Sequence, residues 1–215
     1  MAQRIAFLVD GFNVYHSVLA CLSMGDIRRG KWFDYRKYFE WLVSVNPNFA
    51  KGSSVSSVRL YSAFAFHIRK AGVVERHRVL NSALEARGAE VTLGNFKSKT
   101  IKCGAVCGLD FIKYEEKETD INVAMGMVEA FVGEAADCAV IVSGDTDLIA
   151  AIRTAKLLFP EKRIGVLMPA YRGNNHIKSV AHFALKIKPK HYEEYQMPDQ
   201  VVANDGTVIQ KPASW

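Results

Sequence analysis

The sequence lacks the features that place a protein in or across a membrane. No stretch reaches the roughly 18 uncharged apolar residues that a membrane-spanning helix needs. The chain also runs from Met1 straight into a strand-like segment, without the long apolar core of a signal peptide. It contains only 4 cysteines. We therefore expect a cytoplasmic protein with no membrane contact, whose cysteines are reduced thiols.

Several motifs for phosphate chemistry are missing as well. The sequence has neither a Gly-x-x-x-x-Gly-Lys-Ser/Thr loop nor a Gly-x-Gly-x-x-Gly segment after its first strand. It also lacks the Asp-x-Asp of haloacid-dehalogenase phosphatases, because Asp10 is followed by Gly11 and Phe12. Repeats and low-complexity segments are absent too. These absences argue against common nucleotide-binding folds and make a metal-dependent phosphatase the weaker alternative.

The composition that is present suits one buried domain. The chain has 215 residues, of which 49% are hydrophobic and 23% charged. Its net charge is +6, and residues 51–117 supply the excess, with 12 basic and 6 acidic side chains. A basic region beside an acidic site suits a bound polyanion, although a solvated lysine surface explains the charge equally well.

Two apolar runs of the sequence end in carboxylates. Residues 138–142 form a wholly apolar strand pattern that leads into Asp145 and Asp147. Residues 4–9 repeat the pattern and end at Asp10. Ligands of open parallel sheets bind beyond the carboxyl ends of the strands, so these acids are expected to lie at the same level.

The remaining patterns predict an α/β fold with a mostly parallel sheet. We assign residues 1–188 to one domain with a β-hairpin insertion at 97–114, and residues 189–215 to a C-terminal tail or hairpin turning at Asp205 and Gly206. Further strands are expected at residues 58–64, 90–96, 163–168 and 183–187, and helices at 13–22, 34–45, 75–87, 120–132 and 146–158.

Asp120 is a third candidate acid, because it lies in the first turn of the helix expected at 120–132. Grouped carboxylates repel one another unless a hard cation such as Mg²⁺ or Mn²⁺ neutralises them. Such an ion can activate water and stabilise the charge that develops on a phosphodiester. A simpler interpretation makes Asp10 and Asp145 helix caps and Asp147 a favourable charge at a helix start. Capping alone does not explain why acids end two different buried strands.

Three short blocks together resemble a known family. Residues 9–13 (Val-Asp-Gly-Phe-Asn), 116–120 (Glu-Lys-Glu-Thr-Asp) and 143–147 (Ser-Gly-Asp-Thr-Asp) look like the signature blocks of the NYN domain family, within the PIN-like nuclease superfamily. The resemblance extends over residues 4–187. It implies a three-layer α/β sandwich, and it implies cleavage of RNA with a divalent metal held by acids.

The resemblance also implies roles for individual residues. Asp10, Asp120 and Asp145 would be metal ligands and catalytic residues, with Asp147 as a fourth acid. We further hypothesise that Lys117 binds the scissile phosphate.

Several polar residues are candidates for substrate binding. The same resemblance implies that Asn13 holds a ligand, a water or a phosphate oxygen and that Ser143 orients a carboxylate. A polar loop at the carboxyl-end level of the sheet offers further groups for a nucleic-acid backbone, unless it is only a solvated turn. These loop residues are Arg172, Asn174, Asn175 and His176.

The cysteines and the aromatic residues leave alternatives open. Cys103 and Cys107 have a spacing near that of zinc ligands, but a structural zinc site needs four ligands, so free thiols are favoured. Aromatic residues in the basic region could stack on bases, although most of them are expected in the core. They are Tyr61, Phe64, Phe66, Phe96 and Phe111.

Three functions are consistent with these patterns. The leading one is a metal-dependent endoribonuclease acting on single-stranded or structured RNA. The second is a catalytically weak or inactive module that binds RNA or a protein, and the third is the phosphatase. The segment 189–215 is expected to contact a second copy of the chain or a partner protein.

Overall fold

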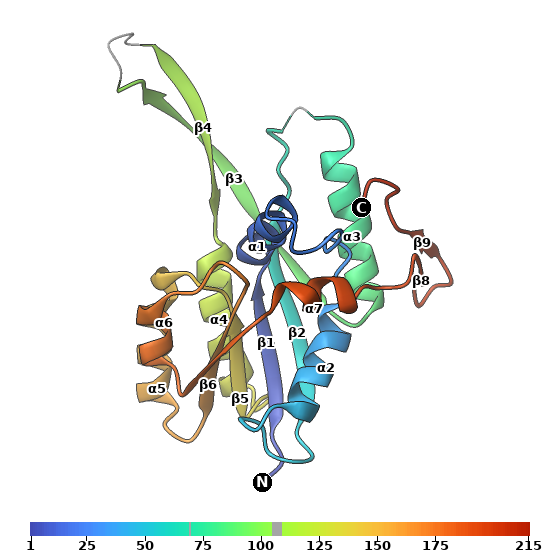
Figure 1. Cartoon of the computed structure of the whole chain (residues 1–215). Helices are drawn as coiled ribbons and strands as arrows, with labels where there is room; N and C mark the ends of the chain where they lie inside the picture. Colours follow the sequence, from blue (N-terminus) through green and yellow to red (C-terminus); the bar gives the residue numbers. More distant parts are fainter. Residues whose placement is uncertain (69, 105–108) are drawn as a thin grey trace.

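A seven-stranded sheet forms the centre of the protein (Figure 1). The computed structural model describes residues 1–68, 70–104 and 109–215. The strand order is β4-β3-β2-β1-β5-β6-β7, and every neighbouring pair except β3 and β4 is parallel. The strands are β1 (Arg4–Asp10), β2 (Ser54–Ala63), β3 (Glu90–Lys102), β4 (Asp110–Lys117), β5 (Cys138–Val142), β6 (Arg163–Met168) and β7 (Phe183–Lys186). The predicted mostly parallel α/β fold is confirmed.

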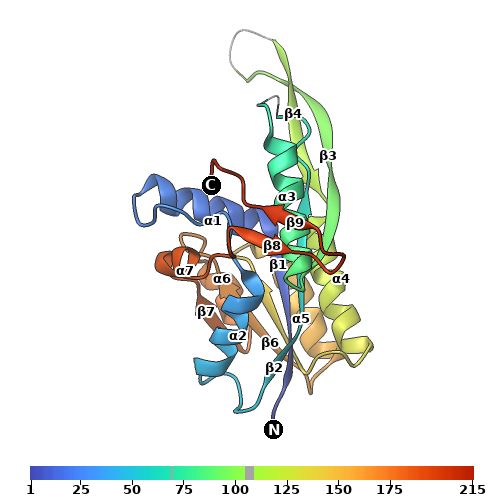
Figure 2. The same ribbon diagram turned by 90° about the vertical axis from the view of Figure 1, so that its right-hand side faces the viewer.

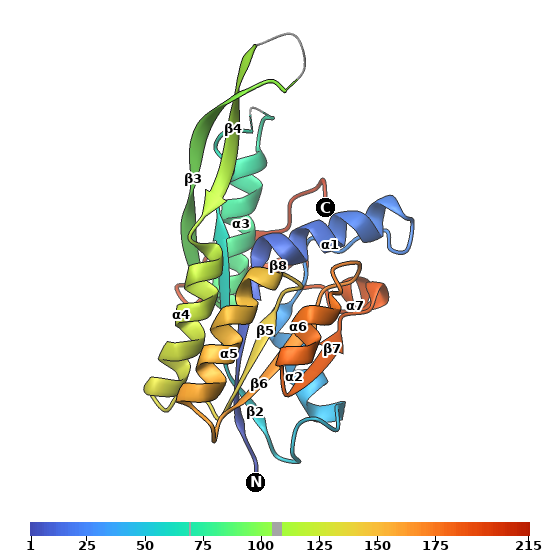
Figure 3. The ribbon, with the colours of Figure 1, turned by 90° about the vertical axis from the view of Figure 1, so that its left-hand side faces the viewer.

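Helices cover both faces of the sheet and make the three layers (Figures 2 and 3). One face carries α1 (Gly11–Ser23), α2 (Tyr35–Val45), α3 (Val73–Ala86) and α7 (Pro189–Glu194). The other carries α4 (Thr119–Val132), α5 (Ile149–Leu158) and α6 (Asn175–Val180). Within the described ranges, none of these helices has the length and apolar character to cross a membrane.

The two central strands are buried on both faces, which explains their unbroken apolar runs. In β5, Cys138, Val140 and Val142 pack into the core under α1 and α2. Ala139 and Ile141 point the other way, into the core under α4 and α5. Successive residues of a strand face opposite sides of its sheet, so this strand contributes side chains to both cores.

The helix termini follow the sequence signals, with one difference. Asp34 caps α2 by accepting a hydrogen bond from the backbone N–H of Lys37 at 3.0 Å. Gly88 follows α3 with a φ of +82°, the left-handed conformation expected there. The helix predicted at 146–158 instead starts as a 3-10 turn, Thr146–Leu148, before α5. The Asp145 side chain accepts from the N–H of Asp147, two residues on, which tightens this turn.

The predicted hairpin is present, but it is continuous with the sheet. The third strand does not stop at residue 96: β3 runs on to Lys102 and pairs antiparallel with β4, from Asn95 opposite Lys117 to Lys102 opposite Asp110. The hairpin projects beyond the rest of the sheet (Figure 1).

That Cys103 and Cys107 are free thiols rather than zinc ligands stays a prediction for the pair, because Cys107 lies outside the described residues. Cys103 is a partly exposed free thiol, and Cys21 and Cys138 are buried free thiols.

The C-terminal segment is packed onto the domain. It contains α7 and a hairpin of β8 (Gln200–Val202) and β9 (Val208–Gln210), as expected around Asp205 and Gly206. The Trp32 indole N–H donates to the carbonyl of Pro198 at 2.8 Å, and Tyr192 is fully buried in the core. Residues 189–201 therefore belong to the folded body rather than to a free tail.

Candidate active site

Asp10 is the best-anchored acid of the predicted site. It is the last residue of β1 and is only 5% exposed. Its carboxylate accepts hydrogen bonds from the backbone N–H of Asn13 at 2.9 Å and from the Ser143 hydroxyl at 2.8 Å. Asp10 therefore does cap α1, as the simpler interpretation required, and it is also tied to the end of β5.

The segment after β5 is fixed to the same point. Ser143 Oγ accepts from the N–H of Asp145 at 3.1 Å, while the N–H of Gly144 donates to Asn13 Oδ1 at 3.1 Å. Asn13 and Ser143 thus join the ends of two neighbouring parallel strands. This network holds Asp10 and Asp145 in fixed relation to each other.

A glycine allows the polar loop to close onto the site. A Cβ atom at Gly144 would lie 1.7 Å from the carbonyl oxygen of Arg172, so only glycine fits beneath this loop. The contact leaves a polar cavity of about 310 Å³ beside the acids. Its lining residues are Asn13, Gly144, Asp145, Thr146, Tyr171, Arg172, Gly173 and Asn174.

Besides burial, the negative charges of neighbouring carboxylates raise the pKa of Asp10 and of Asp120. Burial raises the pKa of Asp10, and the charges of Asp145 and Glu116 raise it further, against the hydrogen bonds from Asn13 and Ser143. Burial also raises the pKa of Asp120 to about 6, and Asp10 and Asp145 are the next largest causes. The four acids come from β1, β4, α4 and the segment after β5, so the fold has gathered like charges.

Asp147 is placed at the margin of this group. Its side chain is exposed, and its charge makes the smallest of the contributions that raise the pKa of Asp120. Its backbone N–H donates to Asp145 Oδ1 at 3.0 Å. This placement suits a supporting role.

Glu116 is an acid that the sequence reasoning did not select. Its Oε1 accepts from the hydroxyl of Thr119 at 2.6 Å and from the N–H of Thr119 at 3.1 Å, which aims it at the start of α4. Lys117 was selected instead, and its Nζ lies 3.1 Å from Oε2 of Glu115. Successive residues of a strand face opposite sides, so Lys117 and Glu116 point away from each other.

His16 is a second residue near the site that the sequence reasoning passed over. Burial lowers its pKa, the charge of Arg172 lowers it further, and the charge of Asp10 raises it. His16 follows Asn13 by three residues, a spacing that places both on one face of α1. That spacing is the signal that could have found it.

The polar loop contributes only part of its predicted set. Arg172 and Asn174 line the cavity. Asn175 accepts from Lys178 Nζ at 3.2 Å, and the backbone N–H of His176 donates to the Asn174 side chain at 2.8 Å. These contacts belong to the start of α6, and neither Asn175 nor His176 lines the cavity.

The donor set fits a hard cation bound partly through water. Within the residues described, no three Asp, Glu, His or Cys side chains are placed to hold one ion together. The gathered side chains nevertheless offer only carboxylate oxygens, and Mg²⁺ usually binds through one or two carboxylates while keeping several waters. One or two of Asp10, Asp120 and Asp145 could contact such an ion directly, with the remaining carboxylates bonded to its waters.

Comparison with known proteins gives a fold match and a family match. The chain is similar in structure to a protein of unknown function from Vibrio parahaemolyticus, with 21% identity, coverage of 91% of this chain and 97% of that one, and a TM-score of 0.57. At this identity the likeness shows the fold alone. No curated protein matches the chain. The profile of the NYN domain matches residues 4–183, which include all three sequence blocks. The chain therefore belongs to the NYN domain family, whose PIN-like members are typically nucleases.

Proposed function

We propose that this protein is a metal-dependent endoribonuclease that hydrolyses RNA at its acidic cluster with Mg²⁺ or Mn²⁺. The acidic cluster is defined as Asp10, Glu116, Asp120, Asp145 and Asp147. Membership of a family of nucleases supports the hydrolytic part of the proposal. The proposal adds three parts to this: the RNA substrate, the metal ion, and cleavage at internal positions of the RNA.

One observation carries the proposal: the acidic cluster holds like charges together without a protein cation to balance them. The charges of Asp10 and Asp145 both raise the pKa of Asp120, after burial. Among the described residues, none of the five acids forms an ion pair with a lysine or arginine. Such an arrangement costs stability at neutral pH, and a divalent cation would remove that cost.

The side chains around the acidic cluster have separate tasks in this proposal. Asp10, Asp120 and Asp145 would hold the cation, and a bound cation supplies activation of water and neutralisation of the charge on the phosphodiester. Ser143 and the N–H of Asn13 orient Asp10. Oriented ligands keep their geometry without reorganisation during the reaction.

The cavity beside the acidic cluster suits the phosphate backbone of the substrate. Arg172 would pair with a phosphate oxygen, and a guanidinium does this through two hydrogen bonds. Asn13 and Asn174 line the same cavity. Their amides offer further donors along the backbone, which carries no sequence information.

Incubation of end-labelled RNA with the purified protein and Mg²⁺ or Mn²⁺ tests the proposal. We expect internal cleavage that leaves 5′-phosphate and 3′-hydroxyl ends, and that stops with a chelator or in the Asp10→Asn/Asp145→Asn double variant. Asp34→Asn is the matched control, because Asp34 is also a buried helix cap but lies outside the acidic cluster.

Other outcomes of this assay assign the other functions. Equal binding of intact RNA by the wild type and the double variant, with no cleavage, would support a binding module and overturn the proposal. Release of phosphate from small esters, with RNA left intact, would support a phosphatase.

A further inference from the structure

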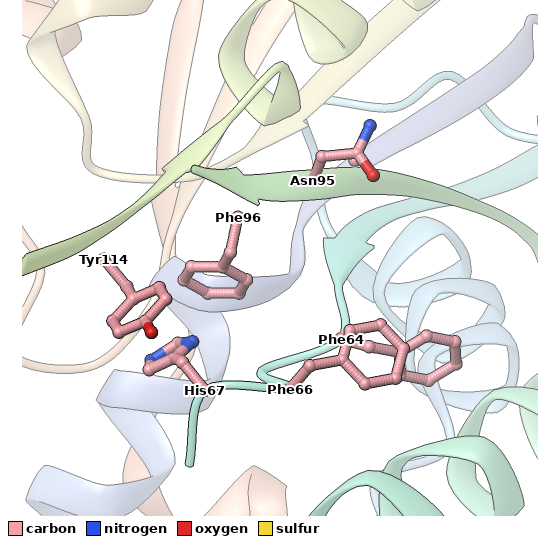
Figure 4. A pocket seen from close by; sticks show the side chains of 7 residues that line it. Phe64, Phe66, His67, Asn95, Phe96 and Tyr114 are labelled. Carbon is pink, nitrogen blue, oxygen red and sulfur yellow. The ribbon is translucent and has the colours of Figure 1, made fainter. Parts of the chain in front are cut away.

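A hollow lined by aromatic rings lies at the base of the β3–β4 hairpin (Figure 4). Phe64 and Phe66 lie on one side of it, on the segment after β2, and Phe96 and Tyr114 lie on the other side, on the hairpin. The lining residues are Phe64, Phe66, His67, Gly94, Asn95, Phe96 and Tyr114. We call this set the aromatic hollow.

The rings of the aromatic hollow are not part of the protein's core. None of them belongs to the buried clusters under the helices. Phe66 is 66% exposed and Tyr114 is 42% exposed. The His67 ring stacks on Tyr114, with 4.5 Å between centroids and 11° between planes. Exposed apolar rings that gather around a depression mark a binding surface.

The size of the aromatic hollow limits what it can hold. Its volume is about 140 Å³. A pocket that encloses a whole drug-sized ligand has roughly 300–1,000 Å³, so this one suits a single flat ring. Nδ1 of His67 is shielded from solvent and has no hydrogen-bond partner in the part of the chain that the structure describes. A polar group on the edge of the bound ring would give this nitrogen a hydrogen-bond partner.

The charges around the aromatic hollow favour an anionic ligand. The Arg78 guanidinium lies 5.3 Å from the ring centroid of Phe64. Lys70 follows His67 by three residues. Burial lowers the pKa of Lys31, and the charges of Arg76 and Lys70 lower it further, so these three basic groups lie near one another. A flat ring joined to a polyanion is a nucleobase in a nucleic acid.

The aromatic hollow adjoins the acidic cluster. The Phe96 ring contacts Phe12 edge to face at 5.6 Å, and Phe12 follows Asp10 by two residues. A Cβ atom at Gly94 would lie 3.1 Å from Oε1 of Glu116. Gly94 lines the aromatic hollow and Glu116 belongs to the acidic cluster. A nucleic-acid strand that lies across one site therefore reaches the other.

We propose that the aromatic hollow binds one unpaired base of single-stranded RNA by stacking, next to the nucleotide presented to the acidic cluster. The inference rests on the proposed function for its choice of RNA. In a duplex both faces of a base are already stacked, so a duplex has no free ring to insert. The aromatic hollow would thus make the enzyme select single strands.

The test measures RNA binding in chelator, where no cleavage occurs. A short fluorescently labelled single-stranded RNA is titrated with the full chain, and its anisotropy is followed. We expect Phe66→Ala and Tyr114→Ala each to weaken binding about 5- to 150-fold, the range of one lost base–aromatic stack. Phe66→Trp and Tyr114→Phe keep a ring and should bind like the wild type.

Controls separate this inference from the proposed function. Leu157→Ala removes an exposed apolar side chain on α5 and should not change binding. Asp145→Asn should abolish cleavage without weakening binding in chelator. Equal binding by the wild type and both alanine variants, or equal competition by a duplex of the same sequence, would overturn the aromatic hollow as a base site, even if RNA cleavage is found. Loss of cleavage alone, with these binding differences intact, would overturn only the proposed activity.

Discussion

Two buried aspartates cap helices in this protein, but their surroundings differ. Asp34 accepts from the N–H of Lys37 at 3.0 Å, and its other oxygen lies 3.0 Å from the Arg87 guanidinium. Asp10 accepts from the N–H of Asn13 at 2.9 Å, and the charges that shift its pKa are those of two carboxylates, Asp145 and Glu116. The same capping bond thus occurs once with a countercharge and once without.

On the proposed function, this difference makes Asp34 a structural acid and Asp10 a metal ligand. Capping explains the hydrogen bond at both positions. It leaves the negative charge of Asp10 uncompensated, and a buried charge without a partner is costly. The cation of the proposed function would supply the missing positive charge and so offset this cost.

The largest difference between these aspartates is expected in catalysis. Asp10→Asn keeps a capping oxygen but removes a ligand charge, so it should lower the rate of RNA cleavage by about 100-fold or more. Asp34→Asn should leave the rate within about threefold of the wild type. Cleavage of labelled RNA at saturating Mn²⁺ measures both, and equal losses in the two variants would remove the distinction.

For the stability of the metal-free protein in chelator, the larger effect is expected at Asp34 rather than at Asp10. Asp34→Asn breaks the ion pair of a carboxylate that is 1% exposed with an arginine that is 40% exposed, and should cost about 2 kcal/mol. Asp10→Asn relieves repulsion and should leave the free energy of unfolding unchanged or higher. For a chain of this length, about 2 kcal/mol lowers Tm by roughly 4–8 °C. A fall in Tm for Asp10→Asn as large as that for Asp34→Asn would contradict the account.

A smaller effect is expected in the pH dependence of the metal-free protein. The pKa of Asp120 rises from 3.8 to about 6, so the folded state binds its proton more tightly than the unfolded state. Its contribution to stability is therefore fully present below about pH 4 and is lost as the pH rises through 6. Urea unfolding in chelator should show this loss in the wild type and not in Asp120→Asn.

Asp137 provides the opposite case outside the acidic cluster. Its hydrogen bonds from Arg4 lower its pKa to about 2, so its contribution is present above about pH 4 and is lost as the pH falls toward 2. Arg4→Gln should weaken that acid-side loss and leave the change near pH 6 intact. Because the pair is largely exposed, the effect should be small.

The smallest effect is expected at Lys117. Its ammonium pairs with Glu115 on the face of β4 that points away from Glu116. Lys117→Met should therefore change cleavage by less than about threefold, whereas Glu116→Gln should reduce it more. A loss in Lys117→Met as large as that in Asp10→Asn would contradict this expectation and support the hypothesis that Lys117 binds the scissile phosphate.

The positions of Asp10 and Asp145 were predictable because their signals are local. A buried parallel strand shows as an unbroken apolar run, and the residue that ends it must lie at the carboxyl edge of the sheet. The order of β1 and β5 as direct neighbours then brings Ser143 onto Asp10, a contact across 133 residues. The resemblance to NYN domains predicted that these residues lie close together. Hydrophobic periodicity alone does not predict which strands are neighbours.

Other features depend on contacts that no local pattern reports. Whether Glu116 or Lys117 faces the acids depends on the pairing of β4 with β3, and a shift of one residue would exchange them. Asn175 and His176 are taken up by the start of α6. The burial of residues 189–201 likewise depends on distant partners such as Trp32.

Direct titration of Mn²⁺ tests most closely the claim that the acidic cluster is completed by a cation. Calorimetric titration of the metal-free chain should give one bound Mn²⁺ per chain, with protons released because the raised pKa of Asp120 must fall as the ion binds. Asp34→Asn should bind in the same way, and the Asp10→Asn/Asp145→Asn variant should bind no ion at the same concentrations. A wild-type chain that binds no Mn²⁺, or a double variant that binds it equally well, would contradict the account.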